Sequence, residues 1–136
     1  MNKTEKLFQK LDDKIDCVLI TSDVNRRYFT GMKSSAGCLV VLREKSYLLI
    51  DFRYIEKARN TVKNAEVIEQ NDFINQLKEI FKKHNVRNIG IEAENMTVKE
   101  FSLYKSKLNN YNFIDDNNVS SAVNMLRAVK DDEEIN

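Results

Sequence analysis

Hydrophobic and polar residues follow two alternating spacings along this chain, and their order predicts a single α/β domain. Apolar residues at the 3.6-residue helical spacing predict an opening amphipathic helix over residues 4–14. A short, continuous apolar run at 17–21 predicts a buried strand. The next stretch, 22–35, is polar and shows neither spacing, so it enters the predicted order as a connection.

The rest of the chain predicts a hairpin followed by alternating helices and strands. Two short apolar runs, 37–43 and 46–51, are separated by only two residues, which predicts an antiparallel hairpin. We therefore expect a mixed sheet flanked by helices, with the hairpin as its antiparallel part. The later predicted strands are 66–70, 88–92 and 111–115. Three later helices are predicted to begin after Asp51, after Asp72 and at the Thr97–Glu100 capping box, and a fourth is predicted to cover 119–129.

Composition excludes most metal and nucleophile chemistry for this chain. Its 136 residues include one His and two Cys, too few for a His-rich zinc site, a Cys₄ site or an iron–sulfur cluster. His84 is the only imidazole, and we expect it to end a helix as a cap or to face solvent. Cys17 and Cys38 lie in apolar runs and are predicted to be reduced core residues.

Charge and hydropathy give expectations about partners and location. Lys and Arg total 22 against 21 Asp and Glu, with no basic stripe, which argues against a nucleic-acid partner. No apolar run approaches 18 residues, and the first residues lack the apolar core of a signal peptide. We therefore expect no membrane partner and a cytoplasmic location.

A few charged residues stand out as candidates for chemistry. Glu92 and Glu94 follow a predicted strand, where α/β folds place ligands, but no third group joins them, so we expect solvated loop charges. Arg53 lies near a predicted helix start, where a cation is disfavoured, and a bound carboxylate would stabilise it. The acidic run 131–134 fits either the first turn of a helix or a solvated tail, and the residues alone leave both open.

Several segments together resemble the creatinase/prolidase N-terminal domain family. Two positions depart from the family pattern: Ser34 stands for a usual Gly, and Arg26 for a usual apolar residue. These departures bear on the shape of one loop and not on the fold. The resembling segments are NRRYFTGM at 25–32, KSSAG at 33–37, LLIDFRYIEKA at 48–58, IGIE at 89–92 and LRAVKDDEEI at 126–135.

The resemblance implies a fold and a domain organisation. The implied fold is a mixed sheet flanked by helices, described as ribonuclease H-like. Residues 1–127 would form the domain, and 128–136 would begin the connection to a C-terminal "pita-bread" metallopeptidase domain. That absent domain would hold two divalent metal ions (Mn, Co or Zn), whose activated water attacks the bond before proline. This chain, having none of the metal ligands, is expected to be inactive alone.

The resemblance also implies a role in assembly and substrate binding. In this family the N-terminal domain helps form a dimer. In some members it also lends side chains to the substrate cleft, which is often the cleft of the partner subunit. The matching positions are Arg53 and Tyr54, with Tyr28 and Phe29 from the earlier loop. The implied partners are the protein's own catalytic domain, a second copy and proline-containing peptides. Two alternatives stay open: a peptidase-like interaction module without catalysis, and the N-terminal domain of a creatinase-type amidinohydrolase.

Overall fold

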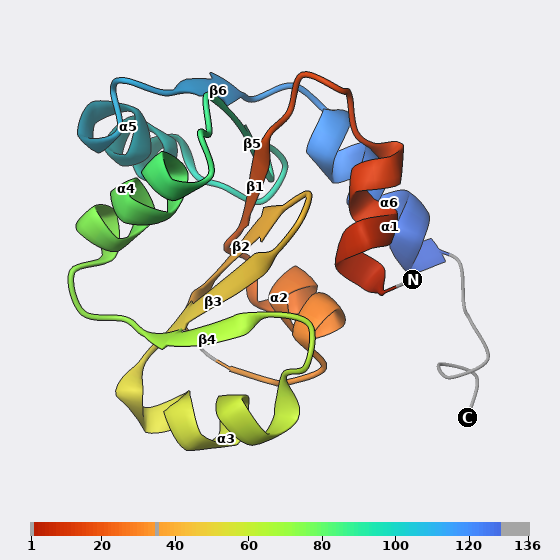
Figure 1. The fold of residues 1–136 in the computed structure, drawn as a ribbon. Coiled ribbons are helices and arrows are strands. Elements are labelled where there is room, and N and C mark those ends of the chain that lie inside the picture. The colour runs from red at the N-terminus through yellow and green to blue at the C-terminus, as the bar shows by residue number, and fades with distance from the viewer. Residues whose placement is uncertain (1, 35, 129–136) are drawn as a thin grey trace.

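The computed structural model contains one six-stranded mixed sheet with helices on both faces, as the sequence predicts (Figure 1). The structure describes residues 2–34 and 36–128. The predicted connection at 128–136 therefore lies outside the described residues, except for Ala128, which ends the last helix. No helix among the described residues is long and apolar enough to cross a membrane.

The strands run in the same direction with a single exception. Their order across the sheet is β4-β3-β2-β1-β5-β6. Strand β2 pairs antiparallel with both neighbours, and the other pairs are parallel. The predicted hairpin is thus confirmed as β2 and β3, inserted into an otherwise parallel sheet. The strands are β1 (Cys17–Ile20), β2 (Cys38–Leu42), β3 (Ser46–Ile50), β4 (Glu66–Glu69), β5 (Asn88–Ile91) and β6 (Asn112–Ile114).

Helices cover both faces because the central strands are apolar on both sides. In β1, Val18 and Ile20 face one core with α1, α2, α3 and α6, whereas Cys17 and Leu19 face the other core with α4 and α5. This alternation is the two-residue period of a strand. The helices are α1 (Lys3–Lys10), α2 (Asp23–Thr30), the short 3₁₀ helix η1 (Phe52–Tyr54), α3 (Ile55–Thr61), α4 (Phe73–Lys83), α5 (Val98–Lys107) and α6 (Asn118–Ala128).

Helix α2 was not predicted, and its burial pattern explains why. Its buried face carries Asn25, Arg26, Phe29 and Thr30, so polar side chains occupy positions where an amphipathic helix usually has apolar ones. Only the capping residues carried a signal. The side chain of Ser22 caps the N-terminus, and Gly31 ends the helix in the left-handed conformation at φ 76°.

Two other predicted helices differ from the structure in detail. The first helix ends at Lys10 rather than near 14, because Asp12 begins a turn in which its carboxylate accepts the backbone N–H of Lys14. Helix α5 begins with the predicted capping box of Thr97 and Glu100. Val98, the first residue of this helix, is 83% exposed, so the apolar spacing of the helix does not extend to its first residue.

Both cysteines are free, buried core residues, as predicted. Burial, with a smaller contribution from the negative charge of Glu92, raises the pKa of the Cys38 thiol to about 12. Burial also raises the pKa of Cys17. Neither thiol is therefore a nucleophile near neutral pH.

Gly90 allows α6 to pack directly on the central strand β5. A Cβ atom at this position would lie 2.6 Å from Cγ2 of Val119, a contact that requires one of the two elements to shift. Val119 is fully buried, so its side chain has no open space to move into. The glycine of the IGIE segment is thus explained by close approach of a helix.

We predict that Gly90→Ala lowers the free energy of unfolding by about 1–3 kcal/mol, because it overpacks the α6–β5 contact. Urea denaturation of the wild type and the variant measures this difference. The double variant Gly90→Ala/Val119→Ala should lose less free energy of unfolding than the two single variants lose together. If the two losses simply add, contact with Val119 is not what excludes a side chain at position 90.

Candidate functional site

Polar residues from distant parts of the sequence meet at the carboxyl edge of the sheet. Because all strands except β2 are parallel, β1, β3 and β5 end at this edge. Thr21, Asp51 and Glu92 each follow one of these strands, and the loop that leads from α2 to the antiparallel β2 ends at the same edge. In α/β folds this edge is where ligands bind.

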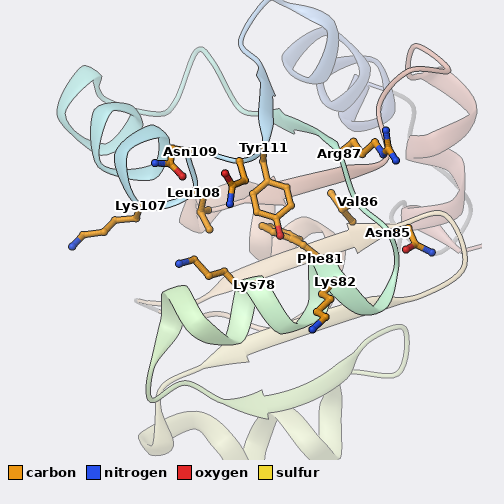
Figure 2. Close-up of a pocket in the computed structure, with 11 residues that line it drawn as sticks. Lys78, Phe81, Lys82, Asn85, Val86, Arg87, Lys107, Leu108, Asn109 and Tyr111 are labelled. Carbon is orange, nitrogen blue, oxygen red and sulfur yellow. The ribbon is translucent and has the colours of Figure 1, made fainter.

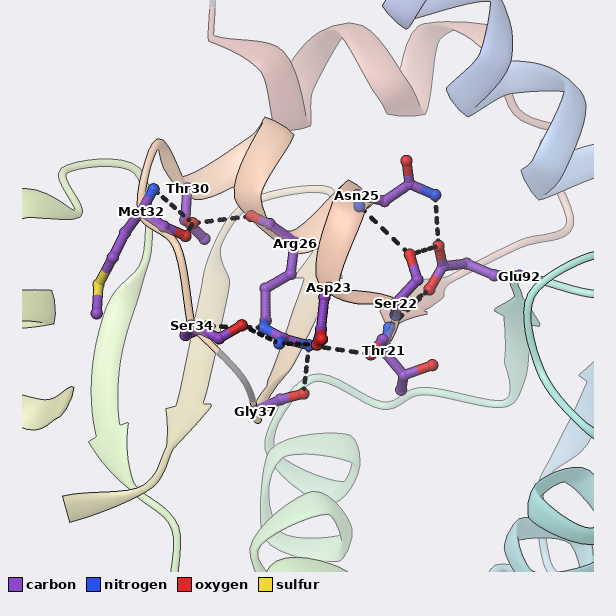
Figure 3. A network of polar contacts seen from close by, with 10 residues as sticks. All are labelled: Thr21, Ser22, Asp23, Asn25, Arg26, Thr30, Met32, Ser34, Gly37 and Glu92. Carbon is purple, nitrogen blue, oxygen red and sulfur yellow. Dashed lines mark hydrogen bonds and ion pairs between the residues drawn. The ribbon is translucent and has the colours of Figure 1, made fainter. Parts of the chain in front are cut away.

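Glu92 fills the crevice between the ends of β1 and β5. Its Oε1 accepts the backbone N–H groups of Thr21 at 2.7 Å and Ser22 at 2.9 Å, and its Oε2 accepts the Ser22 hydroxyl at 2.7 Å and Asn25 Nδ2 at 2.6 Å (Figure 3). The residue is fully buried. The prediction of a solvated charge is therefore wrong for Glu92, whereas Glu94 is exposed as expected. A buried carboxylate persists only with such a complete set of donors.

The Glu92 network extends to the last helix. Asn25 donates to Glu92 and its Oδ1 accepts Arg127 Nη1 of α6 at 3.1 Å. From the same helix as Asn25, the Tyr28 hydroxyl donates to the Leu126 carbonyl at 3.2 Å. Three segments that carry the family resemblance, around residues 25, 92 and 127, are thus joined in one chain of hydrogen bonds.

Arg26, the residue after Asn25 on the buried face of α2, organises the loop between α2 and β2. Its side chain is 1% exposed. Its Nη1 donates to the carbonyls of Thr21 at 2.9 Å and Gly37 at 3.0 Å, and its Nη2 donates to the Ser34 carbonyl at 2.9 Å (Figure 3). The guanidinium also pairs with Asp23. The loop is therefore tied to both β1 and α2 by one cation.

The two departures from the family pattern contact each other. Arg26 Nε donates to the Ser34 hydroxyl at 3.0 Å. A glycine at 34 would leave this N–H without that acceptor, and an apolar side chain at 26 would leave the loop carbonyls without a donor. The altered residues therefore form a matched pair that holds this loop.

Arg53 and Tyr54 lie together at the same edge, in η1. The Arg53 side chain is 60% exposed, and its Nε donates to Asp51 at 3.1 Å. Its guanidinium lies 5.6 Å from the centre of the Tyr54 ring. The backbone N–H and the guanidinium of Arg53 lower the pKa of the Asp51 carboxyl, so this group stays ionised at neutral pH. Its negative charge partly balances the positive charge of Arg53.

Tyr54 also lines a basic hollow of about 440 Å³ between α2, the following loop and α3. Arg27, Lys33 and Lys57 supply its cations, and Asp23 supplies its one carboxylate. The open space next to Tyr54 is thus positively charged, which suits an anionic group of a ligand.

The other two predicted site residues have different surroundings. Tyr28 is half-buried and contacts α6 through its hydroxyl, and Lys3 lies 4.2 Å above its ring. Phe29 is 3% exposed and packs in the core against the edge of Tyr28. The structure thus brings Arg53 together with Tyr54, and Tyr28 with Phe29, as two pairs.

His84 lies away from this edge, beside the turn of the hairpin. It ends α4, as predicted, but its side chain is only 10% exposed rather than solvated. Nδ1 lies 2.6 Å from Glu44 and Nε2 lies 2.8 Å from the Tyr47 hydroxyl. Its role is to join α4 to the β2–β3 turn. Across residues 2–34 and 36–128, no three His, Cys, Asp or Glu side chains gather where they could hold a metal ion.

Comparison with known proteins decides the family. The model of the creatinase/prolidase N-terminal domain matches residues 3–129, nearly the whole chain. The chain belongs to this family. The six-stranded mixed sheet described above is therefore the fold of a creatinase/prolidase N-terminal domain, as the resemblance implies.

Relatives of this domain are longer proteins. The chain is 33% identical to the "Uncharacterized peptidase YqhT" of Bacillus subtilis, with 99% of this chain and 37% of that protein covered. It superposes on an Xaa-Pro dipeptidase from Bacillus anthracis with a TM-score of 0.87 at 27% identity, covering 98% of this chain and 37% of the other. The chain thus spans little more than a third of these relatives.

A similar domain has also been solved as a separate chain. The N-terminal domain of the cytoplasmic peptidase PepQ from Mycobacterium tuberculosis matches with a TM-score of 0.74 at 25% identity. The match covers 88% of this chain and 96% of that one. Such a creatinase/prolidase N-terminal domain therefore has a core of its own.

We predict that Glu92→Gln lowers the free energy of unfolding by about 2–4 kcal/mol. In either orientation the new NH₂ group faces buried donors, so at least one pair of hydrogen bonds is lost. The matched control is Glu94→Gln, which removes the same charge from an exposed side chain and should change stability by less than about 0.5 kcal/mol. Equal effects of the two substitutions in urea denaturation would contradict the role of Glu92.

Proposed function

We propose that this chain is the non-catalytic N-terminal domain of a metal-dependent peptidase that cleaves the bond before proline. The parent protein would be an Xaa-Pro aminopeptidase or an Xaa-Pro dipeptidase working in the cytoplasm. The observation that carries this proposal is the match of nearly the whole chain to little more than a third of an Xaa-Pro dipeptidase. In this proposal the domain shapes the substrate cleft and helps the protein form a homodimer.

The chemistry of the described residues supports a non-catalytic role. The crevice at the carboxyl edge, where a ligand would bind in many α/β enzymes, is filled by the Glu92 side chain and its four hydrogen bonds. His84 is engaged by Glu44 and Tyr47. The two metal ions implied by the family, Mn, Co or Zn, would be held by the remainder of the protein and would activate the attacking water there.

The contribution of this domain to the cleft would come from Arg53 and Tyr54. Only Nε of Arg53 is engaged by Asp51, and the guanidinium makes no other hydrogen bond within the described part of the chain. Its two terminal nitrogens can therefore bind both oxygens of a peptide carboxylate. Tyr54 supplies an aromatic face beside that cation, and Tyr28 and Phe29 would position the helix that carries the adjoining loop.

The test is Arg53→Ala in the full-length polypeptide, assayed on an Xaa-Pro dipeptide with Mn²⁺. We expect kcat/KM to fall by about tenfold, which corresponds to the loss of about 1.4 kcal/mol of transition-state stabilisation. The matched control is Arg59→Ala, which removes an exposed arginine of α3 and should leave kcat/KM unchanged.

Three outcomes would contradict the proposed function, and a fourth would contradict only the role of Arg53. Hydrolysis by the 136-residue chain alone would place catalysis in this domain. A full-length wild type without activity would favour the interaction-module alternative, and activity restricted to creatine-like substrates would favour the amidinohydrolase. If Arg53→Ala has unchanged kinetics and the same unfolding midpoint as the wild type, Arg53 does not take part in substrate binding. The family assignment would still hold in that case.

A further inference from the structure

A second basic hollow lies between the C-terminal ends of α4 and α5, on the face of the sheet opposite α2. Its volume is about 500 Å³, within the range of small-molecule sites in proteins. Figure 2 shows Lys78 on its α4 side, Lys107 on its α5 side and Tyr111 between the two segments. The lining residues are Lys78, Phe81, Lys82, Asn85, Val86, Arg87, Lys107, Leu108, Asn109, Asn110 and Tyr111.

The charge of this hollow has one sign. Four lysine and arginine side chains line it and no carboxylate does, although the chain as a whole has nearly equal numbers of both. None of the four cations forms an ion pair within the described residues. The neighbouring carboxylate of Asp16 accepts the backbone N–H groups of Arg87 and Asn88 and does not line the hollow.

Helix dipoles account for only part of this cluster. Lys82 and Lys107 lie in the last turns of α4 and α5, where the partial negative charge of a helix end favours a cation. Lys78 lies one turn earlier, and Arg87 lies beyond the helix just before β5. These two cations gain little from a helix end and are repelled by the other two.

Uncharged donors and an aromatic surface complete the hollow. The side-chain amides of Asn85, Asn109 and Asn110 and the Tyr111 hydroxyl make no hydrogen bond to the described residues and are left to water or a ligand. The Tyr111 ring packs edge-on against the buried Phe81, with ring centroids 5.0 Å apart. The floor is therefore held by the core, while exposed donors surround it.

We infer that this hollow binds a soluble anion that carries two or more linked phosphate groups. A lone phosphate ion would fill only a small part of the volume of about 500 Å³ and would bring fewer charges than the four cations that line it. Linked phosphates supply several charges and many acceptor oxygens, which match lysine ammonium groups and amide donors. This site is on a different part of the domain from Arg53 and does not depend on the proposed peptidase function.

The probe is inorganic tripolyphosphate, titrated into the ¹⁵N-labelled 136-residue chain and followed by amide chemical shifts. We expect saturable shifts confined to residues 78–87 and 107–111, with affinity rising from orthophosphate to pyrophosphate to tripolyphosphate. Affinity should fall severalfold when NaCl is raised from about 20 mM to about 300 mM, since exposed charges are screened by salt.

The decisive variant is Lys78→Gln/Lys107→Gln, which should weaken tripolyphosphate binding by about tenfold or more. The matched control is Lys10→Gln/Lys99→Gln, which removes two exposed lysines outside the hollow and lowers the net charge equally, and it should bind as the wild type does. Equal weakening by both double variants, shifts spread over all basic surfaces, or no saturable shift would overturn the inference. Both variants alter exposed side chains, so folding is checked by the unchanged remaining spectrum.

Discussion

The buried carboxylate of Glu92 is the constraint on which the carboxyl edge of this domain depends. A charged group without access to water is stable only while its hydrogen-bond donors stay in place, and removing one partner of a buried charge costs about 3–5 kcal/mol. Glu92 therefore holds the end of β1 and the start of α2 against the end of β5. Through Asn25 and Arg127 the same constraint reaches α6. The domain thereby fills with its own side chain the crevice in which many α/β enzymes bind a ligand.

Fixing α2 in this way also fixes the loop that follows it. Arg26 follows Asn25 on the buried face of α2, and its side chain reaches the carbonyls of Ser34 and Gly37 in the loop. One helix thus carries a carboxylate network and a guanidinium network on adjacent residues, as Figure 3 shows. The half-buried Tyr54 lines a hollow together with Lys33 and Ser34 of this loop, and the exposed Arg53 precedes it in η1.

The sequence was sufficient for much of the fold and insufficient for the polar core. Strands and most helices could be predicted because their buried faces are apolar, and the hairpin followed from the short spacing of two apolar runs. Helix α2 could not, because its buried face is polar. Glu92 was misassigned for the same reason: a carboxylate after a strand has no apolar signature that predicts burial. The Arg26–Ser34 pair became interpretable only when the fold placed both side chains in contact. Arg53 is a candidate from its position near a predicted helix start, where a cation is disfavoured, and the resemblance indicates the same residue.

Amide hydrogen exchange just after β1 tests most directly whether Glu92 closes this crevice. The backbone N–H groups of Thr21 and Ser22 have the Glu92 carboxylate as their acceptor, whereas the N–H of Asp23, the next residue, has no acceptor among the described residues. We predict that Thr21 and Ser22 exchange as slowly as the amides within β1, while Asp23 exchanges rapidly. If Thr21 and Ser22 exchange as rapidly as Asp23 in the native protein, the carboxylate does not close the crevice and this account is wrong.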